Sequence, residues 1–97
     1  MDISALPADV QSAARIDTNG EVSWPEQQAA RAIEALTVAG HQVLGLDIRD
    51  YLADGTFFEV PWYDSSRQAD VLQALARAGE LEQPDGAVER RVLVTWR

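Results

Sequence analysis

The sequence contains no cysteine, no lysine and only one histidine, His41. Without cysteine, neither a disulfide nor a thiolate metal site can form. A single histidine defines neither a catalytic triad nor a ligand set. The sequence also has no GxGxxG, no phosphate-binding loop and no HExxH. We therefore expect no catalytic residue, no cofactor and no metal, and we interpret His41 as a residue that follows a helix end.

Long hydrophobic runs are also missing. No apolar stretch is long enough to span a bilayer. The N-terminal sequence MDISALPADV lacks the basic start and continuous apolar stretch of a secretory signal. Because the absence of cysteine fits a reducing compartment, we expect a cytoplasmic protein with no membrane partner.

Charge is the most informative part of the composition. Sixteen acidic residues stand against eight basic ones, all arginine, which gives a net charge of −8. Such a surface repels phosphate backbones, so nucleic-acid binding is not expected, and it attracts basic partners instead. The alternative explanation is that acidity only keeps a small protein soluble.

The length and composition predict one folded domain over residues 1–97. With 46% hydrophobic and 25% charged residues, the chain has the balance of a globular protein. A short helix is possible within the first fifteen residues, with Pro7 near its first turn and Val10 on its apolar side. Asn19-Gly20 then predicts a turn.

Residues 24–39 carry the clearest helix pattern. Ser23 and Glu26 have the spacing of a capping box, and Pro25 is tolerated in a first turn. Apolar residues then recur at helical spacing, and Gly40 is placed to end the helix in a left-handed conformation.

A period of two begins after Gly40 and predicts a β-hairpin. Residues 41–52 form one strand and residues 56–63 the other, joined by a turn at Ala53-Asp54-Gly55. A three-residue loop would place Arg49 opposite Glu59, whereas a two-residue loop would bring Asp50 against Glu59, which is a repulsive pair. The three-residue loop is therefore predicted. It also sets Ile48 opposite Val60 and Leu46 opposite Trp62.

This register divides the hairpin into two faces. The predicted apolar face consists of Leu44, Leu46, Ile48, Phe58, Val60 and Trp62. The predicted wet face consists of Asp47, Arg49, Phe57, Glu59, Pro61 and Tyr63. Because Pro61 has no donor, one side of its strand is expected to be an edge.

A second helix and a last strand complete the pattern. Ser65 and Gln68 repeat the capping-box spacing before an apolar stripe that ends at Gly79, and residues 88–97 alternate as a strand. The predicted fold is α+β: a small, twisted, mainly antiparallel three-stranded sheet with two to three helices packed largely on one face.

Aromatic and acidic residues concentrate in the hairpin, and two interpretations stay open. Phe58, Trp62 and Trp96 fall on apolar phases and are expected in the core, whereas Phe57 and Tyr63 fall on the wet phase. The acids Asp47, Asp50, Asp54, Glu59 and Asp64 share this stretch with a single base, Arg49. They are either ordinary solvated residues or part of a protein-binding surface.

The stretch VLGLDIRDYLADGTFFEVPWYDSS resembles the immunity protein 40 family, small bacterial proteins that neutralise toxins of interbacterial competition. Leu44, Gly45, Asp47 and Ile48 match its first strand, and Trp62-Tyr63 match the end of its second. Leu46 stands where a second glycine is typical, and Val60-Pro61 replace an acid–amide pair. The resemblance covers roughly residues 27–76. It implies a non-enzymatic inhibitor that binds a cognate toxin domain.

Charge and resemblance together predict an immunity protein that occludes a basic toxin. The residues expected in or near the contact surface are Asp47, Asp50, Glu59, Tyr63 and Asp64. The alternative is a small acidic interaction module or regulatory subunit without a toxin partner. Either a monomer or a homodimer is compatible with the sequence. A hydrolase that uses paired carboxylates is the third and weakest hypothesis, because it needs two acids converging in a concave site.

Overall fold

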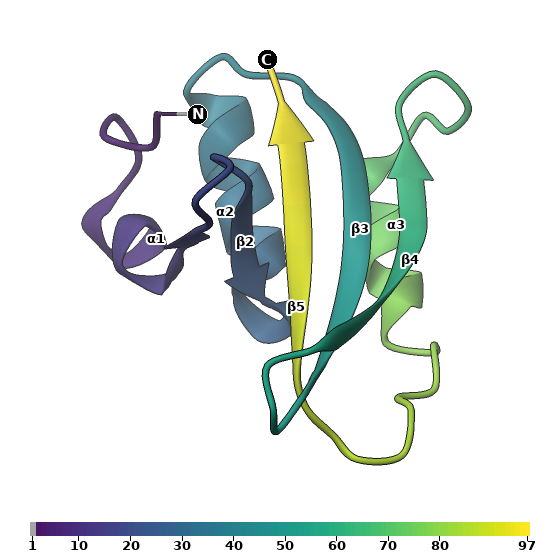
Figure 1. The fold of residues 1–97 in the computed structure, drawn as a ribbon. Coiled ribbons are helices and arrows are strands. Elements are labelled where there is room, and N and C mark those ends of the chain that lie inside the picture. The colour runs from purple at the N-terminus through teal and green to yellow at the C-terminus, as the bar shows by residue number, and fades with distance from the viewer. Residues whose placement is uncertain (1) are drawn as a thin grey trace.

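The computed structural model describes residues 2–97 as an α+β fold (Figure 1). Its helices are α1 (Ala8–Ala13), α2 (Glu26–Val38) and α3 (Val71–Ala78). Its strands are β1 (Arg15–Ile16), β2 (Val22–Pro25), β3 (Val43–Leu52), β4 (Phe57–Asp64) and β5 (Ala87–Trp96). The predicted fold class is confirmed.

The sheet has five strands rather than the predicted three, in the order β1-β2-β5-β3-β4, and every neighbouring pair is antiparallel. Since β5 is antiparallel to both β2 and β3, those two strands run parallel to each other on either side of it. By the same argument β4 and β5 are parallel and flank β3. The fold is therefore two interleaved β–α–β units, β2–α2–β3 and β4–α3–β5.

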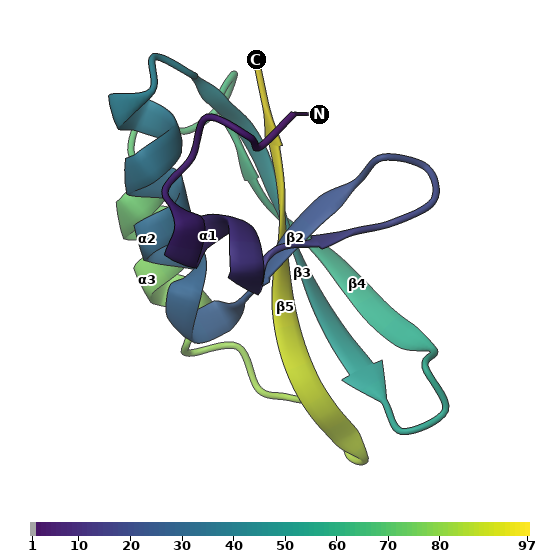
Figure 2. The ribbon, with the colours of Figure 1, turned by 90° about the vertical axis from the view of Figure 1, so that its left-hand side faces the viewer.

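Both crossover helices lie on the same side of this sheet (Figure 2). Packing there buries an apolar layer, whose largest fully buried side chains are Trp24, Ile33, Leu36, Leu46, Ile48, Val22, Val92 and Val94. Helix α1 is attached at the edge of this layer, because the indole Nε1 of Trp24 donates to the carbonyl of Val10 at 2.8 Å. We call the side of the sheet opposite α2 and α3 the open face.

Of the two extra strands, β2 arises from the segment that the sequence assigned to a helix start, and β1 pairs with it across the Asn19-Gly20 turn. Ser23 does not cap α2; it lies in β2, where its hydroxyl accepts from Nε of Arg91 at 2.9 Å. Trp24 is fully buried at the next position, opposite Val92 of β5. A strand that buries Val22 and Trp24 against β5 outweighs the local capping preference. The helix therefore begins at Glu26, after Pro25.

The predicted hairpin register is correct over most of its length. Arg49 pairs with Glu59 and Ile48 with Val60, and Gly55 has a φ of 89° in the turn, as the three-residue loop requires. A bulge between Leu46 and Asp47 then changes the pairing, so that Leu46 faces Tyr63 instead of Trp62. The extra residue on β4 is Trp62, because Asp47 pairs with Pro61.

Two aromatic residues of β4 have environments other than those predicted, and the bulge accounts for one of them, Tyr63. Tyr63, predicted on the wet face, is buried with Leu46 on the helix side. Phe58, predicted in the core, is 53% exposed, because no helix covers that part of β4. Trp62 and Trp96 do pack against the core, as predicted.

Helix α3 also begins later than its sequence indicates. Asp70, not Ser65, is the N-cap, and its carboxylate accepts from the amide of Gln73 at 3.1 Å. Residues 64–68 form a turn instead. Gly40, with a φ of 91°, ends the α2 segment as predicted, and the amide of His41 donates back to the carbonyl of Leu36.

Candidate partner-binding surface

The centre of the open face is occupied by Arg49 of β3. Its neighbours across the register are Glu59 of β4 and Arg91 of β5, so all three side chains emerge on the same side of the sheet. The turn between β1 and β2 reaches over this side and contributes Asp17 and Glu21. Three separate segments of the chain thus meet at one guanidinium.

Three carboxylates contact that guanidinium. Nε of Arg49 donates to Glu59, while its two terminal nitrogens donate to Asp17 at 3.3 Å and to Glu21 at 3.2 Å. The arginine side chain is only 7% exposed, whereas the acids remain 33–38% exposed. The base is therefore enclosed and the acids form its rim. We call Asp17, Glu21, Asp47, Arg49 and Glu59 the Arg49 cluster.

Asp47 belongs to this cluster although it makes no ion pair with Arg49. Partial burial raises the pKa of Asp47 above its ordinary value, and the neighbouring Glu59 and Glu21 carboxylates raise it further, while Arg49 opposes the rise. Burial alone would lower the pKa of Arg49, but its bonds with Glu59 and Glu21 raise it, so the arginine stays charged. Four carboxylates surround one cation, which leaves negative charge uncompensated.

Aromatic rings border the cluster at the hairpin end. The ring of Phe57 lies 4.4 Å from the guanidinium carbon of Arg49 and 5.2 Å from the ring of Tyr51. Arg15 of β1 is 5.5 Å from the Tyr51 ring and pairs with Glu89 at 3.3 Å. Phe57 is 44% exposed, so this rim offers apolar area next to the acids.

A second buried arginine fixes the β1–β2 segment against the sheet. Arg91 donates to the hydroxyl and carbonyl of Ser23, both at 2.9 Å, and to the carbonyl of Ala13 at 3.2 Å. Its remaining charge is balanced by Glu89 at 3.1 Å. These bonds hold β2, and therefore the turn that carries Asp17 and Glu21, in position.

Of the five residues predicted at the contact surface, the structure brings two together there. Asp47 and Glu59 lie on the open face beside Arg49. Asp50 points to the opposite side, where it is 3% exposed and pairs with Arg90 at 2.7 Å. The prediction that Asp50 lies at the surface is wrong. Neighbouring residues of a strand face opposite sides, so Asp50 and Arg49 lie on different faces of the sheet. On its side, α3 and the loop that follows it cover the ion pair.

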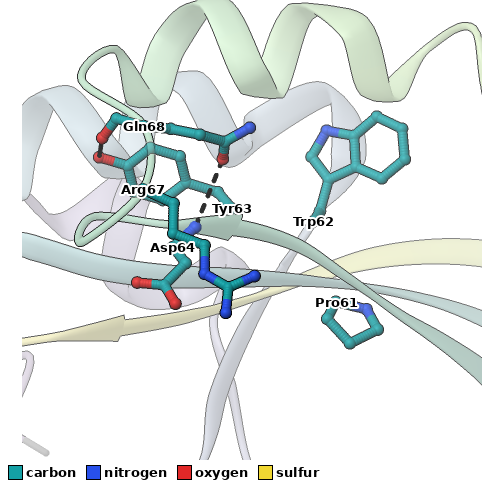
Figure 3. Close-up of a pocket in the computed structure, with 6 residues that line it drawn as sticks. All are labelled: Pro61, Trp62, Tyr63, Asp64, Arg67 and Gln68. Carbon is teal, nitrogen blue, oxygen red and sulfur yellow. Dashed lines mark hydrogen bonds between the residues drawn. The ribbon is translucent and has the colours of Figure 1, made fainter.

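The other two residues lie at the far end of β4 (Figure 3). Tyr63 is 8% exposed and its hydroxyl donates to the carbonyl of Gln68, so its predicted surface position is also wrong. Asp64 is exposed; its Oδ1 accepts from the amide and hydroxyl of Ser66, and these bonds lower the pKa of Asp64. The hollow here, of about 300 Å³, is also lined by Arg67.

Sequence reasoning missed Asp17 and Glu21. Both lie about thirty residues before Arg49, in a turn whose position depends on the unpredicted strand β2. Only the Asn19-Gly20 turn signal marked this segment. Nothing in its local pattern indicates which face of the sheet it covers.

The groups that this surface offers are carboxylates and aromatic rings. Within residues 2–97, no group of three or more histidine, aspartate or glutamate side chains is arranged to hold a metal ion. His41 lies away from the acids, with its ring 6.5 Å from that of Trp96. A rim of partly exposed carboxylates with adjacent aromatic rings suits cationic side chains.

Comparisons with protein-family models, with curated proteins and with solved structures found no match to this chain. Among the described helices, none is long and apolar enough to cross a membrane.

Proposed function

We propose that this chain is a non-enzymatic immunity-type protein that binds a basic toxin domain in the cytoplasm and occludes its active surface. The observation that carries the proposal is the Arg49 cluster. Its carboxylates lie on the open face, and none of the helices described within residues 2–97 covers them. A surface of this kind attracts a basic protein and is unsuited to a phosphate backbone.

The resemblance to the immunity protein 40 family supports the choice of partner. The order that it implies, helix, strand, turn, strand, helix, corresponds to α2, β3, β4 and α3. Asp47 belongs to the stretch that resembles the family's first strand, and it is also part of the Arg49 cluster. Sequence similarity and surface charge thus point to the same strand by separate routes.

The five residues predicted for the contact take different roles in this proposal. Asp47, Glu59 and Asp64 are accessible and contact the toxin, with Asp17 and Glu21 added to the same surface. Asp50 and Tyr63 support it from beneath. The acids accelerate encounter, by ~10- to 1000-fold at low salt for a strongly steered pair. Phe57 then supplies apolar area for the docked state.

The test is coexpression with the C-terminal domain of a large secreted protein encoded directly upstream of this chain. We expect that domain to be basic, to kill cells when it is expressed alone, and to be neutralised by this protein. Killing that this chain does not relieve would contradict the proposal. The remaining alternative is then a small acidic interaction or regulatory subunit with no toxin partner.

The surface is tested with charge variants of unchanged size. Combining Glu21→Gln, Asp47→Asn and Glu59→Gln should slow association and flatten its salt dependence, measured by stopped-flow fluorescence. The matched control is Glu34→Gln, Glu82→Gln and Asp85→Asn, which removes the same charge at exposed positions off the cluster. Equal association rates for the two triple variants would reject the Arg49 cluster as the binding surface.

A further inference from the structure

The outer side of β4 is an unpaired sheet edge. β4 is the last strand in the order and bonds only to β3, and it is eight residues long, whereas the opposite edge strand β1 has two. The amide of Leu52 donates to the carbonyl of Thr56 at the turn. Because bonded and non-bonded pairs alternate along an antiparallel ladder, the backbone groups of Phe57 and Glu59 point outward. The backbone of Pro61 also points outward, but proline has no N–H group to donate.

The helix side of this edge is hollow, with an apolar wall on β4 and the charged residues Arg77 and Glu80 around the end of α3. Phe58 and Val60 are 53% and 38% exposed there, because α3 reaches only the later part of the strand. Between β4 and the end of α3 lies a groove of about 540 Å³. It is lined by Val60, Pro61, Trp62, Arg77, Glu80 and Leu81. Trp62 forms its inner wall, since its Nε1 donates to the carbonyl of Ala74 in α3.

The other side of the same edge is acidic. Glu59 emerges there next to Asp47, at the rim of the Arg49 cluster. A strand added along β4 would therefore place alternate side chains in two different environments: one set in the apolar groove, the other over the carboxylates.

The charges of the chain disfavour a second copy of it as the partner at this edge. A two-fold pairing of β4 with itself, centred on Glu59, would oppose two Glu59 carboxylates and place each Pro61 against a Phe57. Each chain also carries a net charge of −8, so self-association is opposed further. Glu59 and Pro61 thus act against homodimerisation through this edge.

We propose that β4 accepts an extended segment of a basic partner as a sixth strand, antiparallel like every other pair in the sheet, with apolar side chains in the β4–α3 groove and basic side chains over Glu59 and Asp47. The choice of a basic partner rests on the proposed inhibitor function. The strand geometry rests on the free edge and the groove. The partner segment is one in which hydrophobic and arginine or lysine residues alternate.

The probe is an acetylated, amidated octapeptide in which valine and arginine alternate, titrated into the full chain and followed by NMR to millimolar concentration. We expect shift changes at Phe57–Trp62, Arg77 and Leu81, and slower hydrogen exchange at the amides of Phe57 and Glu59. An octapeptide of alternating serine and arginine should bind at least ~10-fold more weakly, because the groove then buries no apolar side chain. Equal affinities would overturn the proposal, as would no binding of the valine peptide.

N-methylation identifies the bonded register. In an antiparallel pairing, peptide residues that exchange bonds with Phe57 and Glu59 share their face, which is the acidic one, so these residues are the arginines. N-methylation of the arginine residues should abolish binding, whereas N-methylation of the valine residues should leave it within about twofold, since the valine amides point away from β4. The reverse pattern, which a parallel strand would give, or equal loss from both, contradicts antiparallel strand addition.

Variants of the protein distinguish strand addition at β4 from the proposed inhibitor function. Val60→Asp, at a half-exposed groove position, should weaken the peptide by at least ~10-fold. The control Val38→Asp lies at the end of α2, where the valine is 88% exposed, and should have no effect. Glu59→Gln should weaken binding ~2- to 5-fold. If toxin neutralisation is lost with the Arg49-cluster variants but kept in Val60→Asp, the inhibitor function stands and strand addition is wrong.

Discussion

The carboxylate of Asp50 and the guanidinium of Arg90 face each other across β3 and β5 in a two-pronged ion pair, with distances of 2.7 and 3.0 Å. Arg90 also donates to the carbonyls of Ala78 and Leu81, at 3.0 and 2.8 Å. The pair therefore closes the C-terminal end of α3 as well as joining two strands. Its members are 3% and 7% exposed, so neither charge has an alternative partner in solvent.

Asp50→Asn should destabilise the fold by about 2–4 kcal/mol, because it leaves the buried guanidinium of Arg90 with only the more distant carboxylate of Glu26, at 3.6 Å, as a counter-ion. The measurement is urea unfolding at neutral pH. Asp85→Asn, at an exposed loop position, is the matched control and should change stability by less than about 0.5 kcal/mol. A loss below about 1 kcal/mol for Asp50→Asn would show that the pair contributes little.

The contrast between Asp50 and Asp47 shows what the sequence can predict. The turn chemistry of Ala53-Asp54-Gly55 and the Arg49–Glu59 pairing predicted the register near the turn, and the structure confirms both. The alternation that places Leu46 and Ile48 on the apolar face also places Asp50 there. What the sequence could not supply is its partner, because Arg90 lies forty residues away in a strand whose position follows from the interleaved topology.

The capping predictions failed for two different reasons. At Ser23 the local capping signal competes with burial of β2 against β5, and the tertiary contact prevails. At Ser65 a local turn prevails, in which Asp64 accepts from Ser66, and Asp70 caps α3 instead. The Trp62 bulge changes the face of Tyr63 without any local sign in the sequence. Periodicity indicated α2, α3, β3, β4 and β5 and the side on which the helices pack, but neither β1 nor β2. The set of acids around Arg49 depends on the pairing of β2 with β5, which local periodicity does not indicate.

Arg49→Met should destabilise the protein by about 2–4 kcal/mol at neutral pH, since it leaves four neighbouring carboxylates without their cation. This loss of stability is smaller than for a fully buried ion pair, because the acids are about one-third exposed and partly screened. Adding Glu59→Gln to Arg49→Met should recover part of the loss. The loss should also shrink at about 1 M salt, because salt screens the repulsion among the carboxylates left without Arg49. A loss that is equal at low and at high salt would point to packing rather than charge.

Asp47→Asn should stabilise the fold at neutral pH, by about 0.5 kcal/mol for a partly screened group. The folded-state pKa of Asp47 is raised, so the folded state favours its protonated form. Its contribution to stability is therefore present below the unfolded value of about 3.9 and is lost as the pH rises through the folded pKa. The gain from Asp47→Asn should accordingly appear above that window and vanish below about pH 4. A variant that is less stable than the parent at pH 7 would contradict the assigned environment.

Trp62 and Trp24 allow one substitution to be compared at two sites. Each indole donates to a helix carbonyl: Trp62 to Ala74 of α3 at 2.6 Å, and Trp24 to Val10 of α1 at 2.8 Å. Trp62→Phe removes the first bond, which contributes about 1 kcal/mol, and should speed hydrogen exchange across Val71–Ala78 more than elsewhere.

Trp24→Phe should instead speed exchange in Ala8–Ala13 and, because Trp24 is fully buried, lower global stability further. Exchange that rises uniformly in both variants would mean that neither indole holds its helix individually. In that case the groove between β4 and α3 would not depend on Trp62 for its shape.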